Sequence, residues 1–210
     1  MQLIKCALLA LFFGVGLTTA SFAAEAVGHI ESLSGEAVII RPGADAAEPA
    51  VVGTPVHQQD IVRSEAGGKV KIRFEDDTVV TVGESSTLKI TEFVYAPKEK
   101  KRRALLTVPE GIFRTVVNLF VPDSRFEVQT ATAVASVQGT EWITEAGLDA
   151  TSLVVVKGKV LVGSSDRTIE ETVVLLQGEG TEVRAGVAPT PKRTWPQTRV
   201  KSFSDRTALD

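Results

Sequence analysis

The segment KVKIRFEDDTVVTVGESSTLKI, from Lys69 to Ile90, decides the fold of this chain. Apolar Val70, Ile72 and Phe74 alternate with cationic residues, and this period of two gives a strand one apolar and one cationic face. The runs 75–77 and 83–86 are rich in residues that favour turns, and strand-like alternation resumes after each. Three short strands joined by tight turns predict an all-β fold.

The residues around this segment resemble the FecR family of bacterial periplasmic domains. The resemblance starts at Gly53 and the run DIVRS at 60–64, and it continues through Gly67 and Gly68 to GESSTL at 83–88. The family usually has an Asp-Gly turn where this chain has Asp76-Asp77. Asp accepts a positive φ better than most residues but less well than glycine.

A second block, RFEVQTATAVASVQGTEWIT at 125–144, resembles the FecR pattern Phe-x-Val-x-Thr-Pro-x-Ala-x-x-x-Val-Arg-Gly-Thr. Ala131 stands in place of the family's proline, and Gln138 in place of its arginine. The many small residues here predict close backbone approach, as in coils stacked on one another. The residues that carry this resemblance are Phe126, Val128, Thr130, Ala131, Ala133, Val137, Gln138, Gly139 and Thr140.

The resemblance covers about residues 27–184 and implies a stand-alone FecR-like domain. Known FecR proteins are inner-membrane regulators of sigma factors that relay a signal from an outer-membrane transporter. This chain shows no cytoplasmic anti-sigma region before a membrane span and no later signalling subdomain. The resemblance therefore implies a non-enzymatic scaffold or ligand sensor that binds an envelope protein or a cell-wall ligand.

The first 23 residues read as a cleavable signal peptide. A short cationic start, Met1–Lys5, precedes an apolar stretch, Cys6–Leu17, which is short for a membrane span. Small residues at 21 and 23 predict cleavage before Ala24 and a periplasmic protein. The alternative is that the segment is kept as a membrane anchor, which would revive a role in signalling.

Charge and cysteine content exclude several classes of function. Loss of residues 1–23 takes the formal charge from −3 to −4, because Lys5 is removed, so neither nucleic acid nor anionic membranes are expected as general partners. Cys6 is the only cysteine, and its loss excludes disulfides and thiol catalysis. The cationic run 98–103 reads as a solvated hairpin end, with a docking patch for an anionic polymer or lipid headgroups as the alternative.

The remaining chain continues the all-β pattern up to residue 184. A strand–glycine–strand pattern recurs around Gly111, Gly139, Gly158 and Gly178, which favours short strands stacked in a β-roll or solenoid-like sandwich. Almost no helix is expected after the signal peptide, and a turn is expected at 109–111. Residues 24–184 are predicted to form the domain.

Residues 185–210 are predicted to form a Pro-rich, basic, extended tail. Trp195 and Phe203 stand out in it, because large aromatic side chains are rare in solvated tails. They either pack back on the sheet or serve as anchors for a partner.

The residues outline no chemical site, and no catalytic, cofactor-binding or metal-binding residue is assigned. His29 and His57 lack metal-ligand spacing, and the run 75–77 reads as a turn rather than a calcium loop. Asp60 reads as a turn residue that bonds to nearby amides. Three hypotheses remain: an interaction module, an enzyme acting on cell-wall carbohydrate, and a structural protein that assembles through its strand edges.

Overall fold

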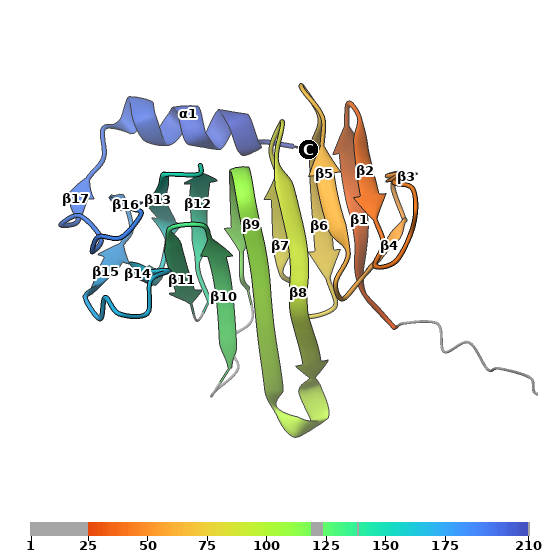
Figure 1. Cartoon of the computed structure of the whole chain (residues 1–210), viewed down its shortest axis with the longest axis horizontal. Coiled ribbons are helices and arrows are strands. Elements are labelled where there is room, and N and C mark those ends of the chain that lie inside the picture. The colour runs from red at the N-terminus through yellow and green to blue at the C-terminus, as the bar shows by residue number, and fades with distance from the viewer. Residues whose placement is uncertain (1–24, 119–123, 138, 210) are drawn as a thin grey trace, which may run out of the picture.

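The computed structural model describes residues 25–118, 124–137 and 139–209. The predicted signal peptide 1–23, the cleavage before Ala24, and Gln138 lie outside these residues. Within them, strands dominate and the structure is all-β, as the alternation predicts (Figure 1). The strands are β1 (Ala26–Ser34), β2 (Ala37–Ile40), β3 (Glu48–Pro49), β4 (Pro55–His57), β5 (Ile61–Ser64), β6 (Lys69–Phe74), β7 (Val79–Val82), β8 (Thr87–Ala96), β9 (Lys101–Val116), β10 (Arg125–Thr130), β11 (Ala133–Val137), β12 (Glu141–Ala146), β13 (Ala150–Lys157), β14 (Lys159–Ser164), β15 (Thr172–Leu176), β16 (Glu179–Arg184) and β17 (Arg193–Thr194).

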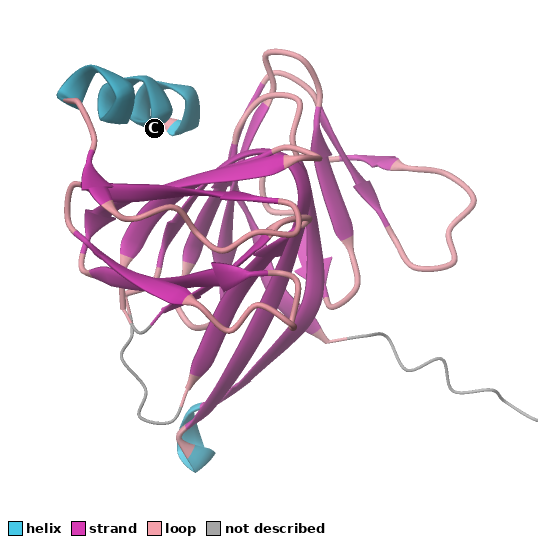
Figure 2. Ribbon diagram, turned by 60° about the vertical axis from the view of Figure 1, so that its left-hand side comes forward, coloured by secondary structure: helices cyan, strands magenta, loops and turns pink. Residues whose placement is uncertain are grey.

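The strands form two sheets that share β9. Sheet A has the order β4-β1-β6-β7-β9-β12-β13-β16-β17. Sheet B has the order β3-β2-β5-β8-β9-β10-β11-β14-β15. The chain passes repeatedly from one sheet to the other, usually after a hairpin, which is the stacked sandwich predicted from the sequence (Figure 2).

The core lies between the two sheets and is bridged by aromatic pairs. Phe74 of sheet A stacks on Phe93 of sheet B, with ring centroids 4.9 Å apart. Phe126 of sheet B meets Trp142 of sheet A edge to face at 6.2 Å. All four rings are buried, so the apolar face predicted for residues 70–74 is the face that closes the sandwich.

Strand β9 runs through the place where a turn is expected, so the prediction of a turn at 109–111 is wrong. Its first half pairs with β8 and β10 in sheet B, and its second half pairs with β7 and β12 in sheet A. Gly111 sits at the crossing with φ +112°, and a Cβ there would overlap the Ser86 side chain. The Ser86 hydroxyl accepts the Ile112 N–H at 3.0 Å. The missing side chain of Gly111 leaves room for Ser86 to make this bond where β9 changes sheets.

The turn between β6 and β7 forms as the sequence predicts. Asp77 takes φ +61° there, at the position where FecR sequences usually have glycine. Aspartate accepts this conformation because its short polar side chain tolerates the left-handed region. The hairpin between β6 and β7 therefore forms with aspartate in the positive-φ position.

The prediction of an extended tail at residues 185–210 is wrong in part. Residues Gln197–Thr207 form the helix α1. Trp195 and Phe203 are 3% and 5% exposed and pack on the outer face of sheet A, as the packing alternative requires. The Arg199 guanidinium lies over the Trp195 ring at 3.6 Å. In the described part of the chain, no helix has the length and hydropathy needed to cross a membrane.

Gly139→Val is expected to lower the free energy of unfolding by about 1–2 kcal/mol. The expected close packing is absent, since the nearest atom to a Cβ at this position is 3.9 Å away, but φ is +81°. Backbone strain is thus the physical cause, and Gly139→Asn should cost less than Gly139→Val because asparagine tolerates positive φ. Urea unfolding of both variants checks this, and equal losses would contradict it.

Candidate functional site

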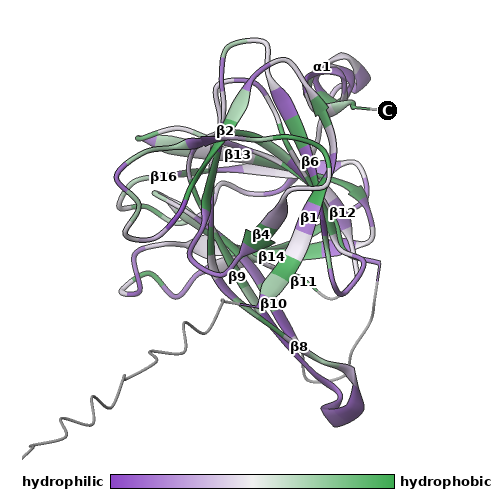
Figure 3. Cartoon of the chain, turned by 90° about the vertical axis from the view of Figure 1, so that its right-hand side faces the viewer, coloured by the Kyte–Doolittle hydropathy of each residue, from purple (hydrophilic) through white to green (hydrophobic). Residues whose placement is uncertain are grey.

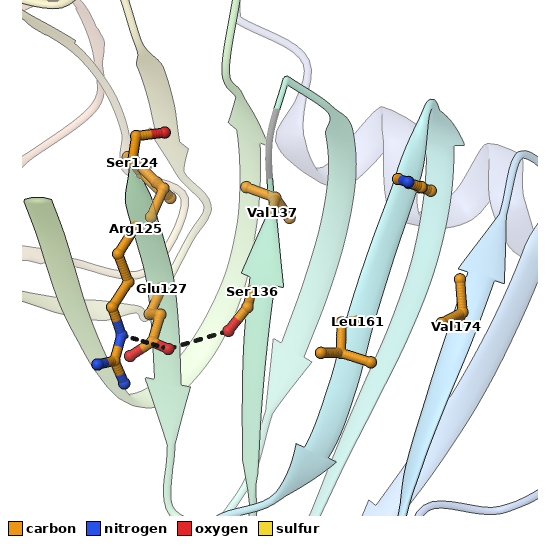
Figure 4. Close-up of a pocket in the computed structure, with 9 residues that line it drawn as sticks. Ser124, Arg125, Glu127, Ser136, Val137, Leu161 and Val174 are labelled. Atoms are coloured by element: carbon orange, nitrogen blue, oxygen red, sulfur yellow. Dashed lines mark hydrogen bonds and ion pairs between the residues drawn. The ribbon is translucent and has the colours of Figure 1, made fainter. Parts of the chain in front are cut away.

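A shallow groove of about 360 Å³ crosses the outer face of sheet B, over β10, β11, β14 and β15 (Figure 4). It spans four strands that are brought together by the sheet and not by the sequence. The residues that line it are Ser124, Arg125, Phe126, Glu127, Ser136, Val137, Lys159, Leu161 and Val174.

The centre of the groove is one row of cross-strand neighbours. Glu127 is paired with Ser136, Ser136 with Leu161, and Leu161 with Val174. Because alternate residues of a strand face opposite sides of the sheet, each of these side chains points away from the core. Ser136 is small and lies between larger neighbours, so the row is hollow at that point.

One half of the row is apolar and exposed. Leu161, Val174 and the adjacent Leu176 are 43%, 47% and 49% exposed, respectively. These residues lie together on β14 and β15, as the register requires. Three exposed apolar side chains are therefore contiguous on this face of the sandwich.

The other half of the row is a polar network. Arg125 Nε donates to Glu127 Oε1 at 2.8 Å, and Ser136 Oγ donates to the same oxygen at 3.0 Å. The hydrogen bond and charge of Glu127 raise the pKa of the Arg125 guanidinium. This network orients polar atoms for binding, and it brings no histidine or second carboxylate to the serine for acid–base chemistry.

Strand β15 forms the edge of sheet B next to the apolar half. Its ladder partner is β14, and the described strands place no ladder partner on its other edge. Leu176 N–H donates to Glu179 Oε2 at 2.8 Å, and this bond, together with Lys192, lowers the pKa of the Glu179 carboxyl. Since backbone groups alternate in direction along a strand, Thr172 and Val174 also face the open edge.

The sequence candidates Asp60 and His57 form a structural turn. Asp60 Oδ2 accepts the His57 N–H at 2.8 Å and the Arg41 Nη1 donor at 2.6 Å. Asp60 is buried, so this carboxylate ties the turn before β5 to the segment after β2. His29 is exposed on β1, where it is paired with Pro55 at the start of β4. No group of three or more potential metal ligands occurs among the residues that the structure describes.

The acidic run 75–77 is also structural. Asp76 accepts the Thr78 N–H at 3.0 Å and the Thr78 hydroxyl at 2.8 Å. It also accepts the Arg102 Nη1 donor at 3.3 Å, with both side chains fully buried. Burial lowers the pKa of the Arg102 guanidinium, and the charge of Asp76 opposes this shift.

Arg102 is buried, although it belongs to the run 98–103, which the sequence predicts to be a solvated hairpin end. The alternation of β9 predicts the burial of Arg102, because its side chain points to the same face as the buried residues Ala104, Leu106 and Val108. Alternation along a strand predicts only part of the groove. It shows which residues face outward, but it does not show which strands lie next to each other.

Comparison with known proteins identifies the central part of the chain. Residues 60–161 match the family model described as "FecR protein". This match is narrower than the range 27–184 that the sequence motifs suggest, and it contains most of the groove but not Val174. A search of curated proteins gives no significant match.

Solved structures show a similar fold. Two crystal structures of a candidate anti-sigma factor from Parabacteroides distasonis align with a TM-score of 0.54 and 21% sequence identity. Each alignment covers 68% of this chain and 63% of the other. At this identity the likeness is one of fold, and the chain spans less than two thirds of the relative's length.

Proposed function

We propose that the chain is a non-enzymatic regulatory or sensing module of the periplasm, because residues 60–161 match the FecR family model. The observation that carries the proposal is the apolar half of the groove, which lies beside the open edge of β15. An open edge offers backbone hydrogen bonds, and exposed side chains beside it offer selectivity. Together they suit an extended segment of a partner protein from the cell envelope.

The charges around the groove define the segment that fits. Arg125 and Lys159 lie at one end, and the exposed acids Glu170 and Glu171 precede β15 at the other. The proposed partner segment therefore has alternating apolar residues, an acidic end and a basic end. Glu179 already accepts the Leu176 N–H, so added backbone bonds centre on Thr172 and Val174.

The proposed location rests on the sequence of residues 1–23, which has the order of a cleavable signal peptide. Mass spectrometry of the protein recovered from an osmotic-shock fraction tests both the periplasmic location and the cleavage of the signal peptide. An N-terminus at Ala24 in that fraction is expected. A full-length N-terminus in the membrane fraction would show that the segment is kept as an anchor.

Val174→Lys is expected to reduce partner binding at least tenfold, because it places a charge in the apolar half of the groove. Val187→Lys is the matched control, since Val187 is 49% exposed and Val174 is 47% exposed, but Val187 is not among the groove residues. The measurement is photo-crosslinking in intact cells from a photoreactive residue at position 172, beside Val174 on the open edge. A single protein adduct that Val174→Lys removes and Val187→Lys retains supports the proposal.

Other adducts would replace the proposal with one of its alternatives. An adduct of twice the chain's mass would indicate a structural protein that assembles through its edges. Muropeptides on position 172 without a protein adduct would indicate binding or modification of a cell-wall polymer. A protein adduct that both valine variants retain would place the partner elsewhere on the molecule.

A further inference from the structure

The hairpin formed by β8 and β9 projects beyond the rest of the sandwich (Figure 1). Its tip comprises the short 3-10 helix Pro97–Glu99 and the residues up to 103. Figure 3 shows the tip as a hydrophilic projection that stands clear of the sheets. The exposed cations of the tip are Lys98, Lys100, Lys101 and Arg103.

These cations form a local positive charge on an acidic chain. Glu99 is the only acid within residues 97–103, whereas the whole chain carries a formal charge of −3. Within the described residues, Lys98, Lys100 and Lys101 have no salt-bridge partner, and Arg103 lies 3.5 Å from Glu92 in an exposed pair. Most of the tip's charge is therefore available to a ligand.

The base of the tip is anchored by Arg102, the one cation of the tip that turns inward. Arg102 reaches Asp76 of the β6–β7 turn at 3.3 Å, and its guanidinium lies 5.6 Å from the centre of the Phe126 ring. These contacts join the hairpin to both sheets at the base of the tip. The exposed cations are thus carried by a hairpin whose base is anchored in the sandwich.

The chain enters the fold at the same end as the tip. Glu25 to Val27 share a surface depression with Val94 and Tyr95 of the hairpin. The apolar stretch 6–17 lies a few residues upstream in the sequence.

We propose that the hairpin tip binds the anionic headgroups of a phospholipid bilayer. A narrow projection reaches a flat surface without hindrance from the sheets, and each lysine near an anionic surface adds to the attraction. This inference is independent of the groove and of the proposed function.

The test is co-sedimentation of the protein, purified from the envelope as cells process it, with lipid vesicles. Vesicles of phosphatidylcholine that contain about one third phosphatidylglycerol are expected to bind it at low salt, and vesicles of pure phosphatidylcholine are not. The triple variant Lys98→Gln, Lys100→Gln, Lys101→Gln is expected to bind at least tenfold more weakly. Raising the salt to about 0.5 M should abolish binding, because the charges are exposed and screened.

The matched control replaces three exposed lysines elsewhere by glutamine: Lys157→Gln, Lys192→Gln, Lys201→Gln. It has the same net charge as the tip variant and should bind vesicles as the unchanged protein does. Equal binding by the two triple variants, or equal binding to both kinds of vesicle, would overturn the proposal. So would binding to soluble polyphosphate without binding to vesicles, because the ligand would then be a free polyanion. Val174→Lys should leave vesicle binding unchanged, which separates this test from that of the groove.

Discussion

Asp76→Ala is expected to lower the free energy of unfolding by about 3–5 kcal/mol, because it leaves the buried Arg102 cation without its carboxylate. Both side chains are fully buried, and Arg102 Nη1 lies 3.3 Å from Asp76 Oδ2. The same carboxylate also holds the turn through Thr78, so its loss opens the β6–β7 connection as well. Urea unfolding followed by tryptophan fluorescence measures the loss.

The double variant Asp76→Ala, Arg102→Met separates the two causes of the lost stability: the buried charge of Arg102 and the lost hydrogen bonds of the β6–β7 turn. Removing both charges should recover much of the loss, since a buried ion pair replaced by apolar groups is often neutral for stability. Asp205→Ala is the control, because its pair with Lys201 is 2.7 Å long but 60–74% exposed, and it should cost less than about 1 kcal/mol. If the double variant were as unstable as the sum of the two single variants, the buried charge would not be the cause.

Trp195→Ala is expected to cost about 3–5 kcal/mol and to detach α1 from sheet A. Trp195 is 3% exposed, meets Phe203 edge to face at 5.4 Å, and lies so close to Gly180 that a Cβ there would overlap its ring. The helix has 11 residues and no side-chain N-cap bond, so its own hydrogen bonds do not sustain it in water. Its stability comes from docking on the outer face of sheet A.

Limited trypsin digestion measures the detachment. Arg199, Lys201 and Arg206 lie on α1, and cleavage there should become fast in Trp195→Ala at temperatures where the sandwich stays folded. Val187→Ala is the control, because that valine is about half exposed, and it should leave the digestion pattern unchanged. Unchanged protection of the helix in Trp195→Ala would contradict the docking account.

The strand content of the fold follows from local patterns. The alternation at 69–74 places Val70, Ile72 and Phe74 in the core, and the polar runs at 75–77 and 83–86 form turns, as predicted. Two of the errors, the turn expected at 109–111 and the extended tail where α1 forms, have different causes. Pro109-Glu110-Gly111 has the residue types of a turn, but in the structure Gly111 lies where β9 passes from one sheet to the other. The helix α1 forms because Trp195 packs on an apolar patch on the outer face of sheet A.

The groove was beyond sequence reasoning for a similar reason. Glu127, Ser136, Leu161 and Val174 come from four strands, and each looks like an ordinary outward-facing residue in its own strand. Their row is set by the register of three strand pairings. No residue in it belongs to a catalytic or metal-binding motif, so motif searches give no signal for it.

The amino-acid sequence by itself determined the all-β class, the positions of most strands and turns, and the resemblance to FecR proteins, whose family model matches residues 60–161. These depend on side-chain alternation and turn chemistry, which act over a few neighbouring residues. The tertiary structure decided which strands became neighbours, where β9 changed sheets, why Arg102 turned inward, and that α1 formed. Those features depend on contacts between residues far apart in the chain, whose energies exist only once the two sheets have closed on their common core.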